Sequence, residues 1–186
     1  MKKILLALAM SLLVLACGGS NKGGTDTGAK KDGKTFTLNL GGEPASIDPQ
    51  ISTDIQGGSV NDLISEGLLK TDKDGKVVAG LAEKWESTPD GLVWTFHLRD
   101  GIKWSNGDPI TANDFKAGWV RALDPAVASE YSYMLYSIKN AEAYNTGKAK
   151  VEDLGIKVID DKTLEVTLGT PTPYFDDLVT FKTYMP

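Results

Sequence analysis

Residues 79–125 constrain the fold most, because their apolar residues change from a spacing of two to a helical spacing. Trp94, Phe96 and Leu98 alternate with residues of the opposite face, which predicts a strand over 93–98 with one buried side. From Thr111 the apolar residues recur every three or four positions, which predicts a helix that ends at Asp124-Pro125. Its expected buried stripe is Phe115, Trp119, Ala122 and Leu123. Apolar stripes of this kind usually form a core, so a mixed α and β domain is expected.

Turn residues separate these elements. Thr88-Pro89-Asp90-Gly91 precedes the strand and Asn106-Gly107 precedes the helix, whose N-terminus Thr111 can cap with Asp114 three residues on. Farther along, residues 155–159 and 163–168 alternate around a short polar stretch and predict a β-hairpin.

Four other segments carry weaker local signals. Residues 36–40 alternate like a half-buried strand, and Ser59 is expected to cap a helix with Val60, Leu63, Ile64, Gly67 and Leu68 on its buried side. Residues 72–75 are expected to form a tight turn between that helix and the next strand, because their spacing does not fit a calcium-binding loop. Residues 138–144 predict a helix that ends at Asn145-Thr146-Gly147.

The N-terminus predicts an exported protein. Residues 1–16 combine a basic start with an apolar run shorter than the about 20 residues that span a bilayer, which indicates a signal peptide. Cys17, the only cysteine, follows in a sequence that resembles a lipoprotein cleavage site, so we expect its sulfur to carry the lipid. Residues 17–34 continue as a glycine-rich polar tract, expected to be a flexible tether.

Composition excludes several classes of function. A net charge of −5 argues against a nucleic-acid partner. His97 is the only histidine, so a metal cluster or a histidine-dependent catalytic triad has nothing to be built from. Glu43 and Asp48 are the only candidate pair of catalytic carboxylates, and no nucleophile accompanies them. We therefore expect no enzyme activity, no metal and no cofactor.

One stretch is similar to a known family. The residues LAEKWE and DGLVWTFHLRDGIKWSNGDPITANDF resemble the signature region of the family 5 extracellular solute-binding proteins, and residues 153–179 continue the likeness. The resemblance covers about residue 36 to the end and implies a two-lobed periplasmic-binding-protein-like fold. It implies that 35–69 begin lobe one, that 70–186 are a subdomain inserted in lobe one, and that the second lobe is missing. The chain is then expected to be a fragment.

Within the family, the closest resemblance is to the oligopeptide-binding proteins of bacterial ABC importers. It implies that Thr53 and Ile55 contact the bound peptide from an extended stretch, and that Tyr131 faces the peptide. Thr53 stands where a glutamate is common in the relatives, and Asp54 is hypothesised to supply that charge instead. The carboxylate that pairs with the peptide's amino terminus belongs to the missing lobe, so no residue here is assigned that role.

The resemblance implies a substrate-binding component of an ABC importer. We expect a monomer, anchored by its lipid in the cell envelope, that captures oligopeptides outside the cytoplasmic membrane and passes them to the permease subunits. Other solutes, such as a dipeptide, a nickel chelate or an oligosaccharide, stay open. A surface interaction or signalling receptor built on the same fold is the alternative from another class.

Overall fold

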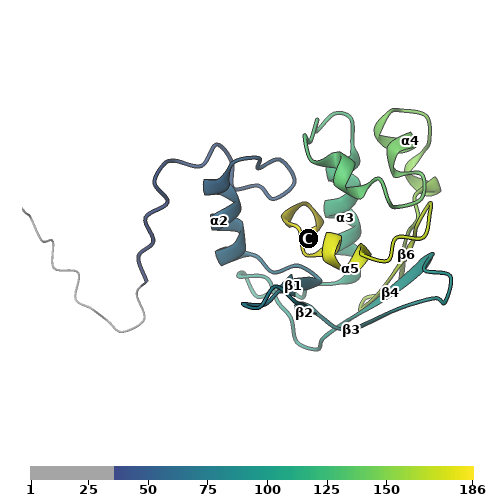
Figure 1. Cartoon of the computed structure of the whole chain (residues 1–186), viewed down its shortest axis with the longest axis horizontal. Helices are drawn as coiled ribbons and strands as arrows, with labels where there is room; N and C mark the ends of the chain where they lie inside the picture. Colours follow the sequence, from purple (N-terminus) through teal and green to yellow (C-terminus); the bar gives the residue numbers. More distant parts are fainter. Residues whose placement is uncertain (1–35) are drawn as a thin grey trace, which may run out of the picture. The chain divides into compact units, whose positions relative to one another are not determined.

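The larger of the two sheets in residues 39–186 has four antiparallel strands (Figure 1). The computed structural model describes residues 36–186, so the expected signal peptide, Cys17, the tether and residue 35 lie outside the described residues. The strand order is β3-β4-β6-β5, and Phe96 of β4 lies opposite Trp85 of β3 and Leu164 of β6. The strands are β3 Ala82–Ser87, β4 Val93–Leu98, β5 Ile156–Asp160 and β6 Thr163–Thr167.

Helices α3 (Ala112–Leu123) and α5 (Phe175–Val179) pack on this sheet. The carboxylate of Asp114 accepts hydrogen bonds from the backbone N–H (2.7 Å) and the hydroxyl (2.9 Å) of Thr111, which fixes the start of α3. The ring of Phe175 lies 5.6 Å from that of Trp94 and 6.3 Å from that of Phe96, so α5 contributes an aromatic cluster to the core.

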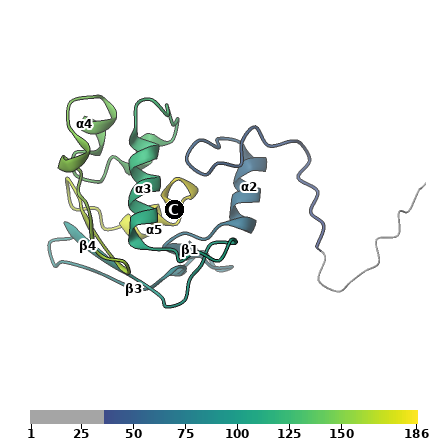
Figure 2. The same cartoon turned by 180° about the vertical axis from the view of Figure 1, so that it is seen from behind.

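Helix α2 (Ile55–Ile64) stands beside α3, and the last residues of the chain lie between the two. Figure 2 shows the C-terminus in this place, as Figure 1 does from the other side. These last residues include the short 3-10 helix η3, Lys182–Tyr184. The remaining elements are β1 Leu69–Thr71, β2 Val77–Ala79, η1 Ser132–Leu135, α4 Ala141–Asn145 and η2 Val151–Asp153. None of the helices in residues 36–186 is long and apolar enough to span a membrane.

The strongest local patterns are confirmed. β4 buries Trp94, Phe96 and Leu98 on one face, and α3 begins after Thr111 and ends before Asp124. The four residues of its predicted stripe are all fully buried. Gly91 and Gly107 have φ values of 69° and 95°, as the two predicted turns require. The hairpin of β5 and β6 forms around residues 161–162.

Two predictions near the start of the described region are wrong. Residues 36–40 form no strand, and Phe36 is 77% exposed, since an alternating pattern forms a strand only when it is paired. Helix α2 begins at Ile55 rather than after Ser59, since Asp54 caps it. Leu63 and Ile64 of the predicted stripe are 59% and 64% exposed and do not face the core, whereas Leu68 is fully buried but lies beyond the end of α2.

Two further predictions hold only in part. Residues 72–75 form a turn, with Gly75 at φ 78°, but this turn joins β1 to β2 and not a helix to a strand. The helix predicted over 138–144 is α4, which begins at Ala141 because Asn140 has a left-handed backbone. The boundary between 35–69 and 70–186 as parts of lobe one stays a prediction.

Trp119→Phe is expected to lower the free energy of unfolding by about 2 kcal/mol, because it orphans a buried carbonyl and leaves a cavity. Trp119 is fully buried, and its Nε1–H donates to the carbonyl of Tyr184 at 2.7 Å. The measurement is a urea titration of the intact protein in which circular dichroism monitors unfolding. Trp104→Phe is the matched control, since Trp104 is 38% exposed; equal losses in both variants would contradict this role of Trp119.

Candidate ligand-binding groove

An open groove of about 380 Å³ brings together all four residues predicted to contact a ligand. Thr53, Asp54 and Ile55 enter it from the start of α2, and Tyr131 enters from the residue before η1. Sequence positions that lie far apart therefore share one surface. The other lining residues are Gly58, Ser59, Asp62, Thr180, Phe181 and Lys182.

The start of α2 is fixed by Asp54. One carboxylate oxygen accepts from the backbone N–H of Gly57 at 2.6 Å, and the other accepts from that of Ala45 at 3.2 Å. Gly57 must stay small, since a Cβ there would lie 2.2 Å from the carbonyl oxygen of Ser46. The carboxylate thus has two backbone partners, and the hypothesis that it supplies charge to a ligand stays a prediction.

The loop before Thr53 is held against α3. The guanidinium of Arg121 donates to both carboxylate oxygens of Asp48, at 2.6 and 2.9 Å, and to the side-chain oxygen of Gln50 at 3.0 Å. This carboxylate raises the pKa of Arg121. Gln50 in turn donates to the carbonyl of Met185 at 3.0 Å, and the hydroxyl of Ser129 donates to the carbonyl of Gln50. The extended stretch that carries Thr53 therefore starts from a fixed anchor.

The backbone of Thr53 is open. Among residues 36–186, neither its N–H nor its carbonyl has a backbone hydrogen-bond partner, and the residue is exposed. Asp54, the next residue, has extended dihedral angles. A free donor and a free acceptor on extended backbone can pair with a second extended chain.

Aromatic and basic side chains form the opposite wall. The rings of Tyr131 and Phe181 meet edge to face, with centroids 5.2 Å apart. The ammonium of Lys182 lies 5.5 Å from the centroid of the Tyr131 ring, within the range of a cation–π contact. This wall offers flat apolar surface beside one positive charge.

Sequence reasoning missed Phe181 and Lys182. They lie far along the chain from Thr53 and follow a short helix without a distinctive motif. Only the packing of η3 between α2 and α3 brings them to the groove. Tyr133 is 55% exposed, and its ring lies beside that of Tyr131 with centroids 6.0 Å apart and the planes tilted by 54°.

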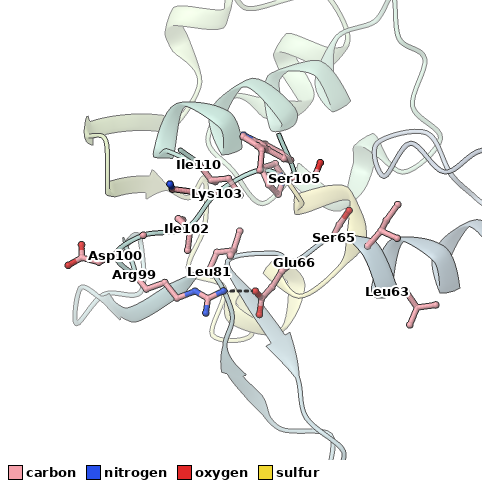
Figure 3. A pocket seen from close by; sticks show the side chains of 14 residues that line it. Leu63, Ser65, Glu66, Leu81, Arg99, Asp100, Ile102, Lys103, Ser105 and Ile110 are labelled. Carbon is pink, nitrogen blue, oxygen red and sulfur yellow. Dashed lines mark hydrogen bonds and ion pairs between the residues drawn. The ribbon is translucent and has the colours of Figure 1, made fainter. Parts of the chain in front are cut away.

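A second hollow, of about 640 Å³, lies between the end of α2 and the loop after β4 (Figure 3). Its walls include Leu63, Leu81 and Ile102, and a dashed line in the figure joins Glu66 to Arg99, which are 2.8 Å apart. Glu66 also pairs with Lys70 at 2.8 Å. Glu66, Arg99 and Lys70 therefore balance one another's charges at this hollow.

The remaining polar candidates show no catalytic arrangement within residues 36–186. Asp48 pairs with Arg121 and not with Glu43. His97 is hydrogen-bonded to Glu86 at 3.1 Å, on the face of β4 opposite Trp94 and Phe96. No group of three potential metal ligands occurs in this part of the chain.

The carboxylate of Asp54, which caps α2, should become protonated at low pH and weaken the cap. The hydrogen bond from Gly57 is the main cause that lowers the pKa of Asp54 below its ordinary value of 3.8. The cap is therefore at full strength above that value and is lost as the pH falls through the lowered pKa. We expect the Gly57 amide resonance of the intact, ¹⁵N-glycine-labelled protein to titrate with a midpoint below 3.8.

Asp54→Asn is expected to abolish this titration while it preserves α2, because asparagine also caps helices well. Asp62→Asn is the matched control, since Asp62 lies on the same helix and has no contact with the cap. A Gly57 titration that survives in Asp54→Asn would refute the assignment of the cap.

Comparison with known proteins agrees with this architecture. The family model "Bacterial extracellular solute-binding proteins, family 5 Middle" matches residues 76–186. The oligopeptide-binding protein OppA of Bacillus subtilis is 46% identical over 186 residues, which are 98% of this chain and 34% of that protein. The dipeptide-binding protein DppE of the same organism is 38% identical over 185 residues, which are 97% of this chain and 34% of that protein.

A solved structure gives the same fold. Haemophilus influenzae OppA in complex with RPPGFSPFR matches with a TM-score of 0.77 and 43% identity, over 80% of this chain and 29% of that one. The mixed α and β architecture of periplasmic binding proteins is thereby confirmed for the part that is covered. The chain spans about a third of the length of the curated relatives that it matches. It belongs to the family 5 bacterial extracellular solute-binding proteins.

Proposed function

We propose that this protein captures oligopeptides outside the cytoplasmic membrane as the substrate-binding component of an ABC importer. The observation that carries the proposal is the free backbone N–H and carbonyl of Thr53, on extended chain that lines an open groove. A peptide in extended form can pair its own backbone with these groups, as in strand addition. The relatives named for oligopeptides and dipeptides support the same ligand class.

The groove suits ligands of varied sequence. Backbone pairing at Thr53 is independent of the ligand's side chains, and the rings of Tyr131 and Phe181 offer apolar contact to many of them. Ile55 is exposed at the start of α2 and adds aliphatic surface. In the two-lobed protein that the resemblance implies, closure of a second lobe would bury the ligand and signal occupancy to the permease.

The family consists of solute-binding, non-catalytic proteins, and we extend this property to the present chain. Glu43 and Asp48 were the only candidate pair for acid–base chemistry, and Asp48 forms an ion pair with Arg121.

We further propose a monomer that is held in the cell envelope by a lipid on Cys17. The relatives support an extracellular or periplasmic location, and the N-terminal sequence supports the lipid.

Native mass spectrometry of the intact protein, with Cys17 replaced to prevent lipidation, is expected to detect a spread of co-purified short peptides. A single non-peptide mass would keep the fold and change the solute. An empty protein that also ignores added peptides would overturn the proposed function and favour an interaction receptor. Peptides cleaved during long incubation would contradict the absence of catalysis.

Tyr131→Ala is expected to weaken peptide binding about tenfold, since a buried aromatic contact in an interface is worth on the order of 1–2 kcal/mol. Titration calorimetry of the intact protein, freed of co-purified ligand, measures the change. Tyr133→Ala is the matched control, because Tyr133 neighbours Tyr131 without lining the groove, and should change the affinity less than about twofold. Equal losses in the two variants would indicate a general disturbance of η1 instead of a ligand contact.

A further inference from the structure

Among residues 36–186, Lys182 is the only basic side chain that lines the groove. Its ammonium lies 5.5 Å from the ring centroid of Tyr131 and 6.0 Å from that of Phe181. Because both rings border the groove, the charge is held at the surface where a ligand would lie. Its place on η3, between α2 and α3, keeps the backbone that carries it in position.

The hydrogen-bonding capacity of Lys182 is mostly unused. Its one hydrogen bond goes to the hydroxyl of Ser52 at 3.4 Å, which is longer than a normal N–H···O bond. No ion pair involves Lys182 among the described residues. An ammonium group has three donors, so at least two remain available to a ligand.

The surroundings of this ammonium favour a negatively charged partner. Lys182 is half-buried, and a Cβ added at Gly58 would lie only 3.4 Å from its Nζ, so α2 shields it on one side. Partial removal from water makes an unpaired charge costly, and pairing restores part of that cost. A carboxylate provides the charge-assisted hydrogen bonds that an ammonium makes best.

Two carboxylates of the protein also line the groove, and neither forms an ion pair with Lys182, although the ammonium is a minor cause that lowers the pKa of Asp54. Both oxygens of Asp54 accept hydrogen bonds from the backbone, at Gly57 and Ala45, so this group is committed to capping α2. Asp62 lies two turns farther along α2 and is exposed. The position beside Tyr131 and Lys182 is therefore left open to an external anion.

We propose that Lys182 binds a carboxylate of the ligand, so that the protein favours peptides with an acidic group at the position against Tyr131. The inference rests on the proposed function and adds a charge preference to it. The carboxylate can belong to an aspartate or glutamate side chain or to the C-terminus of the peptide. Both sources offer the same two oxygens to the ammonium, and they can be told apart by the choice of peptide.

The test uses the intact protein with Cys17 replaced and its co-purified ligand removed. Pentaalanine peptides carry a single glutamate or glutamine at each position in turn, and each is made with a free and with an amidated C-terminus. Calorimetry should show about tenfold tighter binding for the acidic form at one position only, which corresponds to one charge-assisted hydrogen bond. A preference for glutamate identifies a side-chain carboxylate, and a preference for the free C-terminus identifies the terminal one.

Lys182→Met should remove this preference, so that the acidic and the neutral peptides bind with equal affinity. Lys182→Arg should keep it, and so it tests the inference even if the methionine variant does not fold. Lys76→Met is the matched control, because Lys76 is exposed on the β1–β2 turn and its loss changes the net charge equally. The Lys76→Met protein should prefer the acidic peptides as strongly as the unmodified protein does.

The contrary outcomes are distinct. Equal binding of acidic and neutral peptides by the unmodified protein would overturn the role of Lys182 and leave the proposed function intact. Loss of the preference in Lys76→Met as well would show a long-range effect of net charge, which also overturns a direct contact. Failure of every peptide to bind would refute the proposed function, and the inference with it.

Discussion

The burial of Tyr184 between η1 and α3 is the interaction on which the rest of this structure depends. Its phenol donates to the carbonyl of Met134 at 2.7 Å, and its own carbonyl accepts from the indole of Trp119 at 2.7 Å. The two rings, Trp119 and Tyr184, also meet edge to face at 5.1 Å. Burial raises the pKa of Tyr184, so the phenol stays protonated and keeps its donor at any physiological pH.

From this point the contacts extend to the groove. The next residue, Met185, accepts a hydrogen bond from Gln50, which Arg121 holds together with Asp48. Two residues before Tyr184, Lys182 reaches Ser52 and the ring of Tyr131. The three segments that line the groove are therefore joined through η3. Without that short helix, α2 would have few contacts with the sheet domain, since much of its apolar surface is exposed.

This dependence explains what could be predicted from sequence. β4, α3 and the β5–β6 hairpin have strong local patterns, because each buries a periodic face or turns at a glycine or a polar pair. The start of α2 was predicted at Ser59, but Asp54 caps the helix instead, because the backbone N–H groups of Ala45 and Gly57 both donate to its carboxylate. Residues 36–40 alternate like a strand, yet alternation forms no strand without a partner. Phe181 and Lys182 reach the groove only through tertiary contacts of η3, which no local pattern describes.

Some polar groups of the groove form hydrogen bonds that hold the fold, and others remain available to a ligand. Asp54, Asp48 and Arg121 are all engaged inside the protein, and removal of any of these side chains would change the shape of the groove before it changed its chemistry. The backbone of Thr53 and the ammonium of Lys182 are left largely open. Under the proposed function these two groups have different tasks, because backbone pairing accepts any peptide whereas an ammonium discriminates by charge. A receptor of broad range with one charge preference is what such a division of groups would produce.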